Sequence, residues 1–299
     1  MQPMLDFKRS HPSRGFTLVE LILAIVLSGM IVTVFVSTLM SMFRTSVVQK
    51  AQLELGQENQ LALSIIERDI RLATAFDTAP AYTPFVDYYG ANGTNENATP
   101  IAWSYKGTDA DHRVLILRQI ATSTPPFVTA RTPVYVQGSV TSPYATANTG
   151  LNCTLYDKVS SPAGTLSYNP KLPYYLIYFV RSGVLYRRTL TDVTTARCNS
   201  MAQYQKQSCP GVDASRPASC LVNDEKIVDN VTSFSALYYK TTYDSISGAA
   251  TATDIDAYNQ TDAKALTDIT NALVTLRLDQ KVNGKTRTSK LSIRVGRVN

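Results

Sequence analysis

Proline is missing from a long N-terminal stretch of a chain that otherwise uses it freely. The 299 residues include 14 prolines, yet none lies between Pro12 and Pro80. Because a proline inside a helix costs ~3 kcal/mol or more, this gap predicts one long helix that begins near Phe16. Residues 21–43 also lack any charged side chain. A helix of that length, at ~1.5 Å per residue, can cross the ~30 Å hydrocarbon core of a bilayer.

Residue patterns typical of catalytic sites are scarce as well. The chain has two histidines, His11 and His112, and it contains no glycine-rich phosphate loop, no G-x-S-x-G elbow and no H-E-x-x-H motif. His112 opens an expected strand, where a lone histidine is more often a surface residue than a base or a metal ligand. The sequence therefore predicts a protein that is not an enzyme and holds no cofactor.

One group of acids invites a comparison with calcium-binding loops. Asp254, Asp256 and Asp262 place carboxylates at spacings that suit an oxygen-liganded cation. The EF-hand pattern nevertheless fails, because Tyr258 occupies the third ligand position and Asn259 replaces the turn glycine. A solvated loop is the favoured interpretation, so no metal site is predicted. A calcium site of another kind stays open as an alternative.

Acidic charge is in the minority. Lysine and arginine number 29 against 23 aspartates and glutamates, which gives a formal net charge of +6. The first fifteen residues supply +2 of this, from Lys8, Arg9 and Arg14 against Asp6. The other bases are spread through expected strands and turns rather than massed in one block. This distribution favours a solvated surface over a nucleic-acid site.

A candidate cleavage site precedes the apolar stretch. The leader, residues 1–15, is basic, and a basic segment beside an apolar one predicts that the N-terminus stays in the cytoplasm. In a secretory signal the cleavage site follows the apolar run. Here the candidate bond, between Gly15 and Phe16, comes before it. Glu20 is a carboxylate within the otherwise apolar segment, and such a charge is a functional hint by default.

The residues around this bond carry a resemblance to a known family. Residues 14–20 read RGFTLVE, and uncharged residues follow as far as residue 43. The segment resembles the class III signal of type IV prepilins and of the pseudopilins of type II secretion. The resemblance implies cleavage after Gly15 by prepilin peptidase, methylation of the new Phe16 amine, and pairing of Glu20 with the N-terminal amine of a neighbouring subunit. A plain signal anchor with an acid near its interface is the alternative.

Beyond the apolar stretch the same helix is expected to become amphipathic. Polar and charged residues fill one face of residues 44–76, and apolar residues recur at helical spacings on the other. The expected apolar stripe consists of Val48, Leu55, Ala62, Ile66, Ile70 and Ala73, joined by Leu61 and Ile65. This stripe predicts that the second part of the helix packs against a folded domain. Gly56 is expected to weaken this helix, because glycine stabilises a helix interior by roughly 1 kcal/mol less than alanine does.

Two β-hairpins give the clearest strand signals. Residues 174–181 and 184–190 are apolar runs separated by Ser182-Gly183, and residues 272–282 and 285–295 are separated by Asn283-Gly284. Two-residue connections of this kind favour tight hairpin turns. The remaining expected strands are residues 101–106, 113–120, 134–137 and 226–230, the last leading into 231–240. Residues 77–110, 141–173 and 241–268 are interpreted mainly as loops.

Four cysteines follow the apolar stretch, namely Cys153, Cys198, Cys209 and Cys220. If the N-terminus is cytoplasmic, this region lies outside the cytoplasm, where disulfides form. Four thiols allow three pairings, and the sequence does not choose among them. A zinc site is disfavoured, because the sequence has no C-x-x-C pair and no histidine near these cysteines.

The tyrosines raise the question of a ligand. There are 17, some adjacent, as in Tyr174-Tyr175 and Tyr238-Tyr239, and exposed tyrosines could stack on single-stranded DNA or a glycan. Adjacent residues in a strand point to opposite faces, so at most one of each pair faces a given partner. Most of the tyrosines are therefore interpreted as packing residues. A DNA or surface ligand remains an alternative partner.

These observations predict an α+β fold, with a long helix packed on an antiparallel β-sheet domain. The expected parts are a leader (1–15), a transmembrane helix (16–43), an amphipathic continuation (44–76) and a disulfide-containing extracytoplasmic domain (77–299). The order of hairpins in residues 174–295 also resembles J-type pseudopilins and W-type minor pilins, in pattern only.

The expected function is that of a minor pilin or pseudopilin, a structural subunit of a type IV pilus or a type II secretion-like filament. Such a subunit is held in the cytoplasmic membrane, processed by prepilin peptidase, and then joined to other subunits, here at the tip or at initiation. The alternatives are a DNA-binding competence pilin and a membrane-anchored receptor that enters no filament. The sequence does not distinguish the type IV pilus, type II secretion and competence systems.

Overall fold

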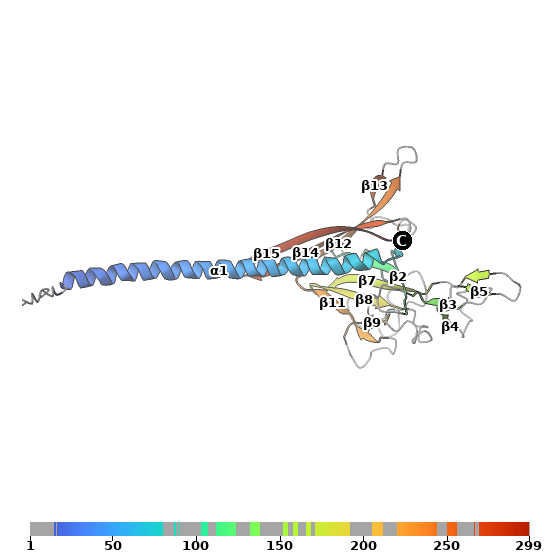
Figure 1. Ribbon diagram of the computed structural model, residues 1–299, viewed down its shortest axis with the longest axis horizontal. Coiled ribbons are helices and arrows are strands. Elements are labelled where there is room, and N and C mark those ends of the chain that lie inside the picture. The colour runs from blue at the N-terminus through green and yellow to red at the C-terminus, as the bar shows by residue number, and fades with distance from the viewer. Residues whose placement is uncertain are drawn as a thin grey trace, which may run out of the picture. The chain divides into compact units, whose positions relative to one another are not determined.

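The computed structural model divides the chain into two compact units, Met1–Ala51 and Gln52–Asn299. The described residues are 15, 17–79, 87, 89, 103–106, 112–123, 132–137, 152–154, 158–160, 166–168, 171–191, 205–211, 220–243, 250–255, 266 and 269–298. Among them, one long helix and a set of mostly antiparallel strands form an α+β fold, as expected (Figure 1).

Helix α1 spans Leu18–Arg71 and confirms the single long helix that the missing prolines predict. It ends before residue 76, the expected limit, because the next backbone groups bond to a strand instead. The N–H of Thr74 donates to the carbonyl oxygen of Arg118 at 2.7 Å. Ala75–Phe76 then form strand β1. The helix thus passes directly into the first sheet.

The part of α1 within the second unit buries one face in the domain core. Leu55, Ala62, Ile66 and Ile70 are buried, as the apolar stripe predicts. Full burial of a leucine or isoleucine side chain stabilises the fold by about 1.5–3 kcal/mol. Leu61, expected beside the stripe, is instead 63% exposed. It lies one position outside the arc that contacts the sheets, since the buried positions recur three, four and seven residues apart.

The first sheet has five strands in the order β1-β2-β7-β8-β11. Besides β1, its members are β2 (Leu115–Ile120), β7 (Pro173–Arg181), β8 (Val184–Leu190) and β11 (Glu225–Val228), and each neighbouring pair is antiparallel. Strand β7 is buried along most of its length because it lies at the centre of this sheet. Apart from β1, which lies where the helix was expected to continue, these strands confirm the expected ones within one or two residues at each end.

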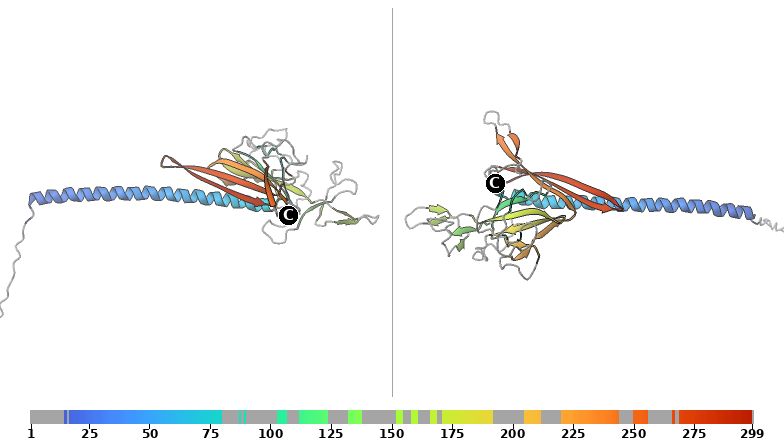
Figure 2. Two further views of the ribbon diagram at one scale, coloured as in Figure 1. Left: turned by 90° about the horizontal axis from the view of Figure 1, so that it is seen from above. Right: turned by 180° about the vertical axis from the view of Figure 1, so that it is seen from behind.

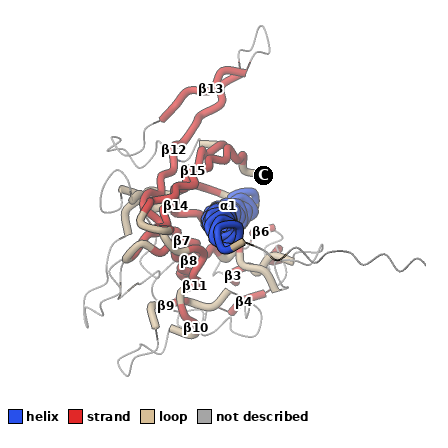
Figure 3. The backbone as a smooth tube through the Cα atoms, turned by 90° about the vertical axis from the view of Figure 1, so that its left-hand side faces the viewer, coloured by secondary structure: helices blue, strands red, loops and turns tan. Residues whose placement is uncertain are grey.

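The second sheet has the order β13-β12-β14-β15. Its strands are β13 (Ala250–Ile255), β12 (Val231–Tyr243), β14 (Asn271–Val282) and β15 (Lys285–Gly296), again antiparallel throughout. In the second unit, β14 and β15 lie along one side of the helix and β7 and β8 along another (Figures 1 and 3).

Both expected hairpin turns have the backbone geometry that their sequences favour. Ser182 and Gly183 have φ of 51° and 74°, and Asn283 and Gly284 have φ of 51° and 75°. Two successive residues with positive φ are the mark of a type I′ turn, whose twist matches that of the flanking strands. Glycine adopts this conformation without the steric cost that other residues incur. These four residues therefore fix the β7–β8 and β14–β15 registers.

Strand β14 joins the second sheet to the helix through alternate side chains. Every second residue, namely Ala272, Val274, Leu276 and Leu278, is fully buried. The helix is also hydrogen-bonded to this sheet. The side-chain amide of Asn59 donates to the carbonyl oxygens of Leu276 at 3.2 Å and of Ser289 at 3.1 Å. The main core thus forms where the helix meets the two sheets.

Two segments expected to be loops contain strands. Within residues 141–173 the structure has β4 (Asn152–Thr154), β5 (Lys158–Ser160) and β6 (Leu166–Tyr168). Strand β4 pairs with β3 (Tyr135–Gln137), the short strand expected at 134–137, and β5 pairs with β6. Strands of three residues are too short to show a detectable alternation of apolar and polar residues.

Within the expected insertion 241–268, β12 continues to Tyr243 and β13 pairs with it. The β-branched threonines of this region favour strands, but their polar character made the region look like a loop. The expected strand 101–106 is wrong over its described part, since residues 105–106 form a turn and residues 103–104 belong to no helix or strand. There Trp103 and Tyr105 are both buried, so the aromatic content reflects packing rather than strand pairing.

Candidate functional site

The start of the helix is closed by a reciprocal pair of hydrogen bonds between Thr17 and Glu20. The backbone N–H of Thr17 donates to Oε2 of Glu20 at 3.0 Å, and the N–H of Glu20 donates to Oγ1 of Thr17 at 3.3 Å. The Thr17 hydroxyl donates to the same carboxylate oxygen at 2.9 Å. This is the capping box T-x-x-E, in which each side chain satisfies a backbone donor of the first helical turn. Glu20 therefore has a local structural role within one chain.

The other carboxylate oxygen of Glu20, Oε1, takes no part in the capping box. Within the described residues, the hydrogen bonds of the Glu20 side chain are all with Thr17 and all use Oε2. Both residues are exposed. A carboxylate offers about four acceptor directions, and an anion at a helix N-terminus is favoured by the helix dipole. The carboxylate can thus accept a further donor without losing its cap.

The candidate cleavage bond lies just outside the helix. Gly15 is exposed and non-helical, and no other part of the structure approaches within 4 Å of the position that a Cβ would occupy there. Phe16, on the other side of the bond, and most of the leader lie outside the described residues. The helix begins at Leu18. The backbone at Gly15 is therefore open to an enzyme in the isolated chain.

The first part of α1 exposes its apolar side chains on every side. Large hydrophobic residues from Leu18 to Phe43 are exposed, and α1 is the one described helix that is long and apolar enough to cross a membrane. Its hydroxyl groups bond within the helix, for example from Thr33 to the carbonyl oxygen of Gly29 at 2.8 Å. Such internal bonds remove the need for water around polar side chains in hydrocarbon.

The domain itself contains two buried charge clusters, and the first holds the end of the helix. Asp69 is 3% exposed, and its Oδ2 accepts hydrogen bonds from the Tyr178 hydroxyl and from Nη1 of Arg187, both at 2.6 Å. Arg187 also pairs with Glu225. Burial and the Asp69 carboxylate raise the pKa of Tyr178 well above its ordinary value. The cluster joins α1 to β7, β8 and β11.

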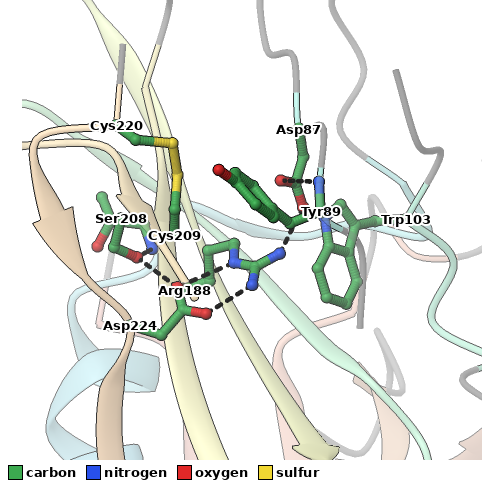
Figure 4. The surroundings of a disulfide bond; sticks show 9 residues. Asp87, Tyr89, Trp103, Arg188, Ser208, Cys209, Cys220 and Asp224 are labelled. Atoms are coloured by element: carbon green, nitrogen blue, oxygen red, sulfur yellow. Dashed lines mark hydrogen bonds and ion pairs between the residues drawn. A yellow bond between two sulfur atoms is a disulfide. The ribbon is translucent and has the colours of Figure 1, made fainter. Parts of the chain in front are cut away.

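The second cluster surrounds Arg188, which is fully buried (Figure 4). Its guanidinium lies between Asp87, at 2.7 Å, and Asp224, at 2.5 Å. Asp87 also accepts the indole N–H of Trp103 at 2.6 Å, and Asp224 accepts the Ser208 hydroxyl at 3.0 Å. Although burial disfavours its charged form, the two carboxylates keep the pKa of Arg188 above its ordinary value. Removing one partner of such a buried pair is strongly destabilising.

A disulfide between Cys209 and Cys220 holds the segments beside this cluster (Figure 4). Cys209 ends the short strand β9 (Ser208–Cys209), and Cys220 lies two residues before β10 (Val222–Asn223), which pairs with β9 in parallel. Closing a loop of this size stabilises a fold by ~3 kcal/mol in the chain-entropy model. Of the other two cysteines, Cys153 lies in β4 with its side chain outside the described set, and Cys198 is outside it altogether.

A small hollow of about 200 Å³ opens beside these elements. Its lining is polar, consisting of Arg187, Thr189, Lys206, Ser208, Asn223 and Glu225 with Val222. The Ser208 hydroxyl is bonded to Asp224, and it accepts the N–H of Thr189 at 2.9 Å. No histidine lies among the described lining residues, and the carboxylate that accepts the Ser208 hydroxyl, Asp224, is also paired with Arg188. The hollow therefore offers a mixture of polar and charged contacts.

The candidate metal ligands are the acids and histidines named from the sequence. Among the described residues, no three His, Cys, Asp or Glu side chains come together as a metal site would require. Asp254 lies in β13, in register with Tyr239 of β12. Asp256 and Asp262 lie outside the described residues, as does His11. His112 forms an isolated bridge with Phe234.

Sequence reasoning missed the buried polar residues Asn59, Asp69 and Arg188. Asn59 and Asp69 occupy helical positions among the buried apolar residues, and this spacing was a usable signal. Arg188 follows Arg187 in β8, and adjacent residues of a strand point to opposite faces. The pair therefore had to place one arginine on each side of the sheet, although the sequence does not show which acids would meet them.

Comparison with known proteins identifies one segment of the chain. The family model described as the prokaryotic N-terminal methylation motif matches residues 10–36. This range contains the candidate cleavage bond, the Thr17–Glu20 capping box and more than half of the uncharged stretch. No curated protein and no solved structure matches the chain.

Proposed function

We propose that this chain, which carries the N-terminal methylation motif of the type IV prepilin and pseudopilin family, is a minor subunit of a filament. The motif match supports a pilin-type or pseudopilin-type structural subunit rather than an enzyme. The finer proposal is a low-abundance subunit, of the J-type pseudopilin or W-type minor pilin kind, at the tip or at initiation of a type IV pilus or a type II secretion-like filament.

The observation that carries the proposal is the geometry at the head of the helix. The matched segment places an open glycine backbone just before the helix and a carboxylate at its third position. In the proposed pathway, prepilin peptidase cleaves between Gly15 and Phe16 and the Phe16 amine is methylated. The apolar part of α1 then remains attached, first in the membrane and later in the filament.

Assembly would use the unoccupied acceptor capacity of Glu20. An ammonium group from a neighbouring subunit can bind its Oε1 while Thr17 keeps Oε2. A carboxylate buried among apolar helices without a partner is costly, so a neighbour that supplies an amine in register is preferred over one that does not. In this way one acid would select the position of each added subunit.

The anchored precursor is proposed to have its N-terminus in the cytoplasm and its β domain outside. The basic leader favours this orientation, and the Cys209–Cys220 disulfide is consistent with an oxidising compartment for the domain. The partners that follow are prepilin peptidase, the membrane, and other pilin or pseudopilin subunits.

The N-terminal mass of the protein recovered from membranes tests this proposal. In cells with active prepilin peptidase we expect a chain that begins at Phe16 and carries a methyl group on its amine. In cells lacking the peptidase we expect the leader to remain. An intact leader in cells with active peptidase would contradict the proposal and would favour a plain signal anchor.

A further inference from the structure

Five basic side chains gather on one hairpin of the second sheet. Residues 277–290, which include the end of β14, the turn and the start of β15, contain five bases and a single acid. They are Arg277, Lys281, Lys285, Arg287 and Lys290, with Asp279. The resulting net charge of +4 equals that of the whole chain once the leader's +2 is removed from its +6. This segment is called the basic hairpin below.

The charges of the basic hairpin are largely uncompensated. Arg277 pairs with Asp279 at 3.1 Å. Within the described part of the chain, Lys281, Lys285 and Lys290 have no ion-pair partner, and all three are exposed. The register also places Arg277 directly opposite Lys290, and like charges in that position destabilise a sheet. An arrangement of this kind is suited to an anionic partner.

The basic hairpin lies at the end of its unit where the chain arrives from the apolar stretch. Gln52, the first residue of the unit, donates from Nε2 to the carbonyl oxygen of Thr288 at 3.4 Å. The turn at Asn283-Gly284 is the end of the hairpin away from the C-terminus (Figure 2). Only residues 44–51 separate Gln52 from the uncharged stretch. A helical segment of that length rises ~12 Å, so the tether to the membrane-spanning candidate is short.

We propose that the basic hairpin binds the anionic phospholipid headgroups of the membrane that holds the apolar helix. The inference rests on the membrane anchoring that forms part of the proposed function. Bases within about 10 Å of an anionic surface are attracted to it at 0.1 M salt, and the attraction falls off beyond that distance. The hairpin would hold the β domain at the membrane surface before the subunit enters a filament.

Single-stranded nucleic acid is the competing anionic partner, and the hairpin is poorly built for it. Proteins that bind single strands combine bases with aromatic residues on which nucleobases stack. Residues 277–290 contain no aromatic residue. A membrane surface requires only exposed positive charge near the anchor, and the hairpin supplies that.

The test adds one exposed tryptophan, as a fluorescent reporter, to the full-length chain. The protein has one tryptophan, Trp103, which is buried, and Thr286 is exposed in the basic hairpin. The T286W variant is reconstituted into phosphatidylcholine bilayers with and without phosphatidylglycerol, each containing a lipid with a spin-labelled headgroup. We expect quenching of the added tryptophan in the anionic bilayers, much less in the neutral ones, and loss of quenching at high salt.

A triple variant and its matched control assign the effect to the hairpin. Each base near an anionic surface contributes on the order of fivefold to binding, so K281Q, K285Q and K290Q together should lower quenching severalfold. The control removes three exposed lysines elsewhere on the domain, with K106Q, K171Q and K206Q, and should retain it. Equal quenching in neutral and anionic bilayers, or equal loss in both triple variants, would overturn the inference.

Two further results distinguish the inference from the proposed function. If the chain floats with the bilayers but the hairpin shows no headgroup contact, the hairpin inference alone is wrong. If oligonucleotide binding depends on the hairpin lysines while lipid quenching is absent, nucleic acid replaces lipid as the partner and the inference also fails. A chain that does not float with the bilayers contradicts the membrane anchoring itself.

Discussion

At the scale of single residues, the contribution of a buried hydroxyl to stability depends on whether it has a hydrogen-bond partner. Tyr178 and Tyr238 are both fully buried in the main core. The Tyr178 hydroxyl donates to Asp69 at 2.6 Å. The Tyr238 hydroxyl has no hydrogen-bond partner among the described residues, although its ring packs edge-on against Phe76 with centroids 5.3 Å apart. The same substitution should therefore have opposite consequences at the two positions.

We predict that Tyr178→Phe lowers the free energy of unfolding by about 1–3 kcal/mol, because Asp69 loses a donor while it stays buried. Tyr238→Phe should leave stability unchanged or raise it by up to ~1 kcal/mol, because a desolvated hydroxyl is removed and the ring contact is kept. Denaturant unfolding of the two variants measures both values, and each variant is the control for the other. Equal destabilisation by both changes would contradict the hydrogen-bond assignment.

At the scale of elements, the turns and the helix use glycine in different ways. Gly183 has φ of +74° in the turn between β7 and β8, a conformation that other residues adopt at a cost. Gly56 lies inside α1, and no other part of the structure approaches within 4 Å of a Cβ placed there. One glycine is therefore required by its backbone, and the other is not.

We expect Gly183→Ala to destabilise the domain by about 1–2 kcal/mol, since alanine is strained at positive φ. Gly56→Ala should stabilise it by about 0.5–1 kcal/mol, because alanine restricts the unfolded chain and favours the helix. The midpoints of chemical denaturation of the two variants test this pair. A gain from Gly183→Ala, or a loss from Gly56→Ala, would be the contrary result.

The elements also show what the sequence was able to predict. The two hairpins were predictable because their turns require positive φ at two adjacent residues, and Ser182-Gly183 and Asn283-Gly284 are residue pairs that favour it. The end of α1 was not, because it depends on a hydrogen bond from Thr74 to Arg118, far along the chain. The Cys209–Cys220 pairing was likewise not predictable, since four thiols allow three pairings and the spacing of the cysteines does not choose among them.

At the scale of the whole molecule, the described residues show an apolar exposed helix and a folded domain with a buried core. The first part of α1 exposes apolar side chains that suit lipid or other helices, whereas the second unit has a conventional buried core. The candidate site at Gly15, Phe16 and Glu20 could be proposed from the sequence because these residues lie within one short continuous motif. The charge clusters around Asp69 and Arg188 were not, since their members come from separate strands and loops.

We predict that Glu20→Ala leaves membrane insertion intact and reduces incorporation into filaments at least severalfold. Insertion depends on the apolar stretch, which the change does not interrupt, whereas the proposed selection of the next subunit requires the carboxylate. Membrane fractionation and the amount of the subunit in sheared filaments measure the two steps. Glu58→Ala, which removes an exposed acid from the later part of the same helix, should not change either quantity.

If the chain is processed as proposed, the capping box also sets an order of events. While the leader is attached, residue 16 contributes an uncharged peptide group beside the positive end of the helix dipole, and the Glu20 carboxylate balances that end. Cleavage at the proposed bond would place a full positive charge one residue before the cap. Two positive ends would then share one carboxylate inside an apolar environment. Proteolysis would thus create a local shortage of negative charge, which a neighbouring subunit can relieve by presenting its own glutamate.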